Sequence, residues 1–224
     1  MSKKKRMPPP KKSSRTMIYA GIALLVIIAA VAYISSDRPT DLLTDAYSFE
    51  STTPAQSTGA YSSLDLNPSE PGKVRIVEFM KFDCDHCYNL NKEMPQILKN
   101  YGDRVEIIYL PISFQGQSIK SIEAYLIAKE MGKGKEMRDA LFKARFESNR
   151  DVMESMLVIK DVAASIGLGP DFNSKLENGY AEKAALKNNA YAGMYKIEGT
   201  PAVLINGKEV NVPDINATIS STLS

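Results

Sequence analysis

The two cysteines of this chain lie in one tetrapeptide, Cys84-Asp85-His86-Cys87. Two thiols separated by two residues can close into a small-ring disulfide and can also return to the dithiol. A disulfide stabilises a fold mainly by restricting the unfolded chain, and this effect grows with the length of the loop that it closes. Because this loop is so short, the pair indicates reversible thiol chemistry rather than a structural crosslink.

The position of the tetrapeptide favours unequal roles for its two thiols. It follows an apolar, strand-like run and opens a helix-like run. Cys84 therefore comes first, where unpaired backbone N–H groups and the helix dipole stabilise a thiolate. We expect Cys84 to be the exposed nucleophile of a mixed disulfide. Cys87, one turn further along, is expected to be the less exposed resolving thiol, with the higher pKa.

The two residues between the cysteines are expected to act on Cys84 in opposite directions. His86, the only histidine of the chain, can stabilise the Cys84 thiolate from the first helical turn. The alternative is an ordinary surface or core histidine. The Asp85 carboxylate should raise the pKa of Cys84 by like-charge repulsion, unless it serves only as a helix cap or dipole partner.

The cysteine motif predicts neither a cofactor nor a metal. Tyr88 stands where a haem-attachment motif needs a histidine, and two cysteines leave two positions of a closed zinc site unfilled. His86 lies between the cysteines rather than at a workable separate spacing. The thiol couple itself is expected to carry the electrons, and a zinc or copper ion shared between subunits is the alternative.

The elements that must position these residues form a β-α-β unit, a helical block and a β-β-α unit. Two runs rich in β-branched and apolar residues predict strands on either side of a helix. These are strands at residues 74–80 and 105–110 and a helix at 86–100. Further helical stretches lie at residues 118–131, 135–148, 151–166 and 180–195, with a short one near 172–177.

A hairpin and a final helix complete the predicted domain. Asn206-Gly207 is a strong turn signal between strands at residues 202–205 and 209–212, and a closing helix follows at 214–222. The fold class is therefore α/β: a thioredoxin fold with a helical block inserted at about residues 115–195.

Taken together, these motifs resemble the DsbA-like group of thioredoxin-fold disulfide oxidoreductases. The resemblance rests on FDCDHCY behind IVEFM and on GTPAVLING about 115 residues later, and it covers the whole folded part. It implies thiol:disulfide oxidoreductase activity. Asp85 departs from the pattern, because DsbA-like proteins commonly have proline there and protein disulfide isomerases have glycine. This departure predicts a less oxidising site.

The resemblance also gives roles to three residues outside the tetrapeptide. Glu78 lies six residues before Cys84, where thioredoxin-like proteins place a buried acid that relays a proton to or from the resolving cysteine. An outward-facing strand carboxylate is the alternative. Thr200-Pro201 resembles the cis-proline loop, whose exposed backbone would bind an extended substrate. The alternative is that Pro201 simply starts a strand.

The N-terminal part predicts a membrane anchor. Residues 17–35 are apolar and uncharged, long enough at roughly 28 Å to span a bilayer as a single transmembrane helix. Residues 1–16 form a basic head without acidic residues, which predicts a cytoplasmic N-terminus and an extracytoplasmic remainder, in the periplasm or at the cell exterior. A signal peptide cleaved near Ala30-Val31-Ala32 is the alternative.

Two further segments follow the expected anchor. Residues 36–60, rich in Ser, Thr, Pro and Asp, predict a flexible linker, and residues 61–224 the folded domain, where residues 61–66 are a candidate edge strand. After the basic head, 21 basic residues stand against 26 acidic ones. This balance argues against nucleic acid as a partner.

The sequence thus predicts a membrane-anchored enzyme that exchanges disulfides with exported thiol or disulfide proteins. Disulfide formation would require a quinone-linked membrane partner for reoxidation. The alternative direction, as a reductase or isomerase, would require a membrane thiol protein that supplies electrons. Thr200 before the proline occurs among reductase- and isomerase-like relatives. A non-enzymatic thioredoxin-like chaperone or metal-binding module is the alternative from another class.

Overall fold

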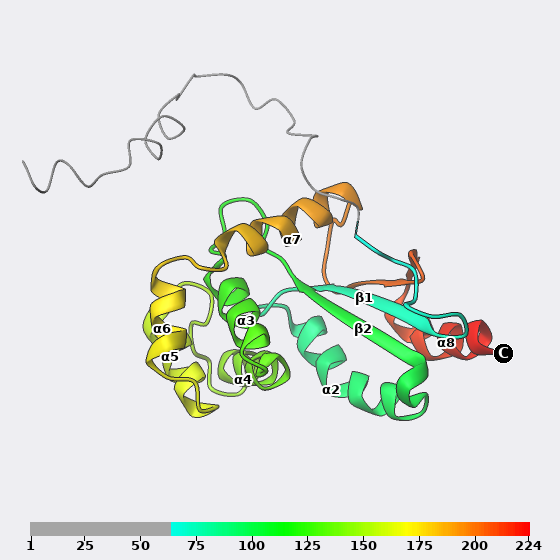
Figure 1. The fold of residues 1–224 in the computed structure, drawn as a ribbon, viewed down its shortest axis with the longest axis horizontal. Coiled ribbons are helices and arrows are strands. Elements are labelled where there is room, and N and C mark those ends of the chain that lie inside the picture. Colours follow the sequence, from blue (N-terminus) through cyan, green and yellow to red (C-terminus); the bar gives the residue numbers. More distant parts are fainter. Residues whose placement is uncertain (1–63) are drawn as a thin grey trace, which may run out of the picture. The chain divides into compact units, whose positions relative to one another are not determined.

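The computed structural model describes residues 64–224, which form a four-stranded sheet with helices on both faces and a helical block (Figure 1). The predicted strands and helices from residue 74 onward are present. The strands are β1 (Val74–Met80), β2 (Val105–Pro111), β3 (Ala202–Ile205) and β4 (Lys208–Val210). The helices are α2 (Asp85–Lys99), α3 (Lys120–Glu130), α4 (Gly134–Phe146), α5 (Met156–Ser165), α6 (Pro170–Glu177), α7 (Glu182–Met194) and α8 (Ile215–Leu223).

The sheet has the order β2-β1-β3-β4. Strand β1 pairs in parallel with β2 and antiparallel with β3, which continues into β4 through a hairpin. Asn206 and Gly207 in the hairpin turn both have positive φ, 45° and 80°, as a two-residue turn of this kind requires. The connection from β1 through α2 to β2 is the β-α-β unit that the sequence predicted, and the whole is a thioredoxin-like α/β fold.

The alternation of side chains along β1 decides what each face of the sheet contacts. Val74 and Ile76 pack with α2 and α8, whereas Val77 and Phe79 pack with α7 on the opposite face. Figure 1 shows α7 on one side of the strands and α2 and α8 on the other. Glu78 is in phase with Val74 and Ile76, so its side chain lies on the face that carries α2.

The helical block lies between β2 and β3 in the sequence and forms a core of its own. Helices α3 to α6 pack around buried residues such as Met137, Leu141 and Phe142. The same cluster includes Phe82 and Cys87 from the thioredoxin-like part. The block is therefore continuous with the surroundings of the cysteine motif, which it covers from one side.

Near the start of the described region the structure differs from the prediction. Leu64 to Leu66, part of the candidate edge strand, do not form a strand. Their backbone carbonyls are bound by side chains instead: Tyr195 donates to the Leu64 carbonyl at 3.3 Å and Arg75 to the Asp65 carbonyl at 3.2 Å. Leu64 and Leu66 still pack on the core beside α7, so their burial was predicted but not their conformation.

The expected anchor at residues 17–35, the basic head at 1–16 and the linker at 36–60 lie outside the described residues. Within residues 64–224, no helix combines the length and the apolar character needed to cross a bilayer.

Candidate active site

Cys84 is the N-cap of α2. Its backbone is extended (φ −97°, ψ 117°), and its sulfur accepts a hydrogen bond from the Cys87 backbone N–H at 3.2 Å. A side-chain acceptor at this position satisfies one of the free N–H groups of the first turn. The Cys84 side chain is half-buried, so its sulfur combines access from solvent with a hydrogen-bond donor that favours a negative charge.

The surroundings of Cys84 lower its pKa to about 6. The largest cause is a hydrogen bond with the Cys87 side chain, and Thr200 and the Cys87 backbone amide act in the same direction. Partial burial and the charge of Asp85 oppose the shift. At neutral pH the Cys84 sulfur is therefore mainly thiolate, which is the nucleophilic form.

Cys87 has the opposite character. Its side chain is fully buried, and its pKa is raised, first by the hydrogen bond to Cys84 and then by burial. The structure holds both cysteines as free thiols. One half-buried but accessible thiolate next to one buried thiol is the arrangement that a mixed-disulfide reaction needs, because one sulfur is attacked and the other then resolves the intermediate.

The Thr200–Pro201 peptide bond is cis, as the family resemblance implied. The Cys84 sulfur lies 3.2 Å from the Thr200 carbonyl oxygen, to which it donates a hydrogen bond when it is protonated. This contact joins residues 116 positions apart, and it places the backbone before β3 directly against the reactive sulfur.

His86 and Asp85 both lie on the exposed side of α2. The Asp85 carboxylate accepts a hydrogen bond from the His86 backbone N–H at 2.8 Å. No hydrogen bond of the His86 ring is found among residues 64–224. Instead the ring borders an open hollow of about 330 Å³ that also includes Leu90, Glu93 and Pro201. His86 therefore forms part of the surface beside the cysteines.

Glu78 is buried, with 1% of its surface exposed. Burial raises its pKa to about 8, and the charge of Cys84 acts in the same direction while Arg138 opposes it. Neither carboxylate oxygen has a hydrogen-bond partner within the described region. A buried acid that titrates near neutral pH on the α2 face is chemically suited to exchanging a proton with a nearby thiol.

Arg138 was not identified from the sequence. It lies on α4 with its side chain only 6% exposed, and its guanidinium carbon is 3.7 Å from the centroid of the Tyr109 ring. A signal was present, because Arg138 precedes Leu141 and Phe142 by three and four positions and so shares their apolar helix face. An arginine on a buried helix face usually has a partner or a function.

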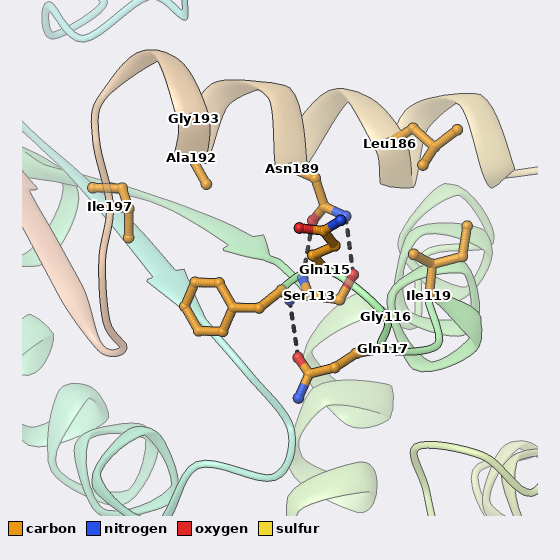
Figure 2. A pocket seen from close by; sticks show the side chains of 11 residues that line it. Ser113, Gln115, Gly116, Gln117, Ile119, Leu186, Asn189, Ala192, Gly193 and Ile197 are labelled. Carbon is orange, nitrogen blue, oxygen red and sulfur yellow. Dashed lines mark hydrogen bonds between the residues drawn. The ribbon is translucent and has the colours of Figure 1, made fainter. Parts of the chain in front are cut away.

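A second hollow, of about 470 Å³, lies between α7 and the loop that follows β2 (Figure 2). Figure 2 shows Asn189 reaching from α7 to this loop: its side chain accepts from the Ser113 backbone N–H and donates to the Ser113 hydroxyl, both at 2.9 Å. Phe114, next in the loop, has its ring 5.1 Å from the ammonium group of Lys81. This hollow has no charged residue in its lining.

The chain is similar to known proteins of the thioredoxin family. A family model described as thioredoxin matches residues 69–224. Among curated proteins, the chain is similar to the thiol:disulfide interchange protein DsbA of Burkholderia cepacia, with 21% identity over 152 residues, which cover 67% of this chain and 71% of that protein. It is also similar to DsbA of Pseudomonas aeruginosa, with 25% identity over 62% of this chain and 66% of that protein.

Solved structures show the same fold. The crystal structure of the oxidoreductase DsbA from Xylella fastidiosa superimposes with a TM-score of 0.59 at 23% identity, over 71% of this chain and 87% of that one. The thiol-disulfide exchange protein α-DsbA2 from Wolbachia pipientis gives a TM-score of 0.57 at 16% identity, over 70% and 85% of the two chains. At these identities the likeness concerns the fold.

Proposed function

This chain belongs to the thioredoxin family and is a DsbA-like thiol:disulfide oxidoreductase, and we propose that it forms disulfides in exported proteins through Cys84 and Cys87. The observation that carries this proposal is the asymmetry of the two thiols. Cys84 caps α2 with a pKa of about 6, whereas Cys87 is buried with a raised pKa. This asymmetry assigns attack to one sulfur and resolution to the other.

In the proposed reaction, a client thiolate attacks Cys84 of the oxidised protein. A bond forms between the client sulfur and Cys84, the Cys84–Cys87 bond breaks, and Cys87 leaves with the electron pair and takes up a proton. A second client thiolate then attacks the first client sulfur and releases Cys84 as a thiolate. The client loses two electrons and the protein gains them. The low pKa of Cys84 makes it a good leaving group in the second step.

Three neighbouring residues have proposed roles in this reaction. The Thr200 backbone next to Pro201 would bind an extended client segment in the manner of an added strand, beside the Cys84 sulfur. His86, exposed at the edge of the site, would contact the client or the partner that reoxidises the protein. Asp85 would moderate the oxidising strength, because its charge raises the pKa of Cys84.

The cellular setting is part of the proposal. The apolar run at residues 17–35 would anchor the chain with its basic head in the cytoplasm, and the linker at 36–60 would carry the domain outside the membrane. Exported proteins would be the clients, and a quinone-linked membrane protein would reoxidise the Cys84–Cys87 pair. This arrangement fits a chain whose thiols require an oxidising compartment to act as a disulfide donor.

A Cys87→Ala variant tests the proposed chemistry. The purified full-length chain would be incubated with a synthetic peptide containing one intramolecular disulfide, and the products would be read by non-reducing mass spectrometry. The variant should retain one peptide per chain, bound through Cys84, because no resolving thiol remains. The unsubstituted chain, supplied as its Cys84–Cys87 disulfide together with the reduced peptide, should release the peptide with a disulfide and be left as the dithiol.

Matched controls define the outcomes of this test. Cys84→Ala should give no adduct, because Cys87 is buried and largely protonated. The absence of an adduct in Cys87→Ala, with the protein folded, would contradict thiol exchange and favour a binding module that holds clients without reacting.

A further inference from the structure

The helical block contributes one buried cation to the interior next to the cysteine motif. Arg138 on α4 stacks its guanidinium group on the ring of Tyr109, at 3.7 Å from the ring centroid. Its neighbours Met137 and Leu141 belong to the same apolar core as Cys87. Arginine stays charged even when buried, so this region of the core has a fixed positive charge.

The strand register brings Glu78 to the same place. Glu78 on β1 is paired with Tyr109 on β2, and paired residues of neighbouring strands present their side chains on the same face. Tyr109 therefore contacts Arg138 and is adjacent to Glu78. Three elements, β1, β2 and α4, thus bring together a buried acid, a partly buried phenol and a buried guanidinium group.

In this cluster, hydrogen-bond acceptors and a donor of opposite charge lack partners. Both oxygens of Glu78 and the Nε of Arg138 are buried without a hydrogen bond in the described part of the chain. The ion pair that Arg138 makes is with Asp139, at 3.4 Å, and the Asp139 side chain is 38% exposed. An ion pair at the rim compensates a buried charge poorly. Glu78 is buried as well, and it lies close enough to Arg138 for the guanidinium charge to lower its pKa.

We propose that Arg138 is a positioning residue for disulfide exchange, which acts through Glu78 by stabilising its carboxylate and so sets how readily Glu78 exchanges a proton with Cys87. This inference rests on the proposed function of the Cys84–Cys87 pair. The helical block would then supply the charge that tunes the acid of the thioredoxin-like part, in addition to covering the site.

The proposed role of Arg138 concerns the proton that passes between Glu78 and Cys87. When a client attacks Cys84, Cys87 leaves as a thiolate and receives the proton of the Glu78 carboxyl group. In the reverse direction, Cys87 gives its proton to the Glu78 carboxylate and attacks the mixed disulfide at Cys84, which releases the client as a thiolate. Both directions require Glu78 to gain and lose a proton near neutral pH, and a neighbouring cation favours the deprotonated form.

The titratable and charged groups around Glu78 come from four elements. Arg138 on α4 lowers the pKa of Glu78, whereas burial and Cys84 at the start of α2 raise it. Tyr109 on β2 and Tyr125 on α3 both have raised pKa values, first through burial and also through the charge of Glu78. The tyrosines are therefore neutral at the working pH, and Arg138 is the group that opposes the effect of burial on Glu78.

The test is the titration of the Glu78 carboxyl carbon, followed by ¹³C NMR in the full-length chain and assigned with Glu78→Gln. Arg138→Gln should move the midpoint upward by about one pH unit or more. Arg138→Lys, which keeps the positive charge, should have a midpoint close to that of the unsubstituted chain. The pH profile for oxidation of the dithiol by oxidised glutathione should move with it. In the Glu78→Gln background, Arg138→Gln should leave that profile unchanged.

Controls separate this idea from a structural role and from failure of the proposed function. Arg145→Gln removes the same charge from the same helix, at a side chain that contacts Asn149, and should not move the Glu78 midpoint. If Arg138→Gln does not fold, Arg138→Met replaces it, because an apolar residue of similar length tolerates burial. An unchanged midpoint in a folded variant overturns the proposal. The NMR titration needs no redox activity, so it is informative even if the thiols do not cycle.

Discussion

At the residue scale, the chemistry of this site depends on the different surroundings of its two cysteine side chains. Cys84 is stabilised as a thiolate by donors at the first turn of α2, while Cys87, three residues later, is enclosed by the core of the helical block. Three positions are enough to separate them, because Cys84 is at the half-open N-cap whereas Cys87 starts the buried face of α2, which continues through Leu90 and Met94.

The pKa of Cys84 gives a prediction about pH. The rate of alkylation of the full-length reduced chain by iodoacetamide should rise with pH and level off above a midpoint of about 6, since the reactive form is the thiolate. Asp85→Asn removes a charge that raises this pKa, so its midpoint should be lower. Alkylation followed by peptide mass spectrometry measures both. A midpoint above 8, or an upward shift in Asp85→Asn, contradicts this assignment.

The sequence identified some of these residues and could not identify others. Cys84 and Cys87 could be ranked because their order along a helix determines which one meets the free N–H groups. Glu78 could not be oriented, because apolar residues flank it on both sides and only the packing of α2 reveals its face. Arg138 was missed because its role depends on a strand register that places Tyr109 beside Glu78.

At the element scale, α7 holds the segment that leaves β2. Asn188 donates from its buried side chain to the Pro111 carbonyl at 3.0 Å, and Asn189 binds both the backbone and the hydroxyl of Ser113. Two adjacent asparagines thus bind the backbone at the end of β2 and just beyond it. The loop that they fix carries Phe114, beside Lys81.

Asn188→Ala should therefore destabilise the domain. It leaves the Pro111 carbonyl buried without its donor, at a cost of about 1–3 kcal/mol, measurable as a lower midpoint in urea unfolding with an unchanged slope. Asn178→Ala is the matched control, because Asn178 is exposed and its side chain hydrogen-bonds the Ser174 side chain, which is also exposed, at 3.4 Å. Equal stability of the two variants would show that the Asn188 contact contributes nothing.

Element boundaries show where local chemistry overrides a hydrophobic pattern. The helix expected at residues 151–166 begins at Met156. The Asp151 carboxylate accepts from the backbone N–H groups of Met153 and Glu154, which holds a turn, and Ser155 then caps the helix by accepting from Val158. Both residue types favour turns and caps over helix interiors, but the apolar periodicity alone does not show where the turn ends.

At the scale of the whole molecule, the fold joins two parts that need each other at the site. The thioredoxin-like part provides the cysteines, the cis Thr200–Pro201 bond and Glu78, while the helical block encloses Cys87 and contributes Arg138. The topology could be predicted because strand and helix signals alternate clearly along the chain. The contact between the two parts could not, because it depends on side chains that meet across distant segments.

The measurement that tests the central claim most directly is the equilibrium of the full-length chain with glutathione buffers, read by thiol trapping and mass spectrometry. We expect one two-electron transition between the dithiol and the Cys84–Cys87 disulfide, at a potential between about −120 and −200 mV, because a Cys84 pKa near 6 stabilises the reduced form. A potential of about −220 mV or lower would contradict disulfide formation as the direction. A chain that does not cycle at all would contradict the exchange chemistry itself.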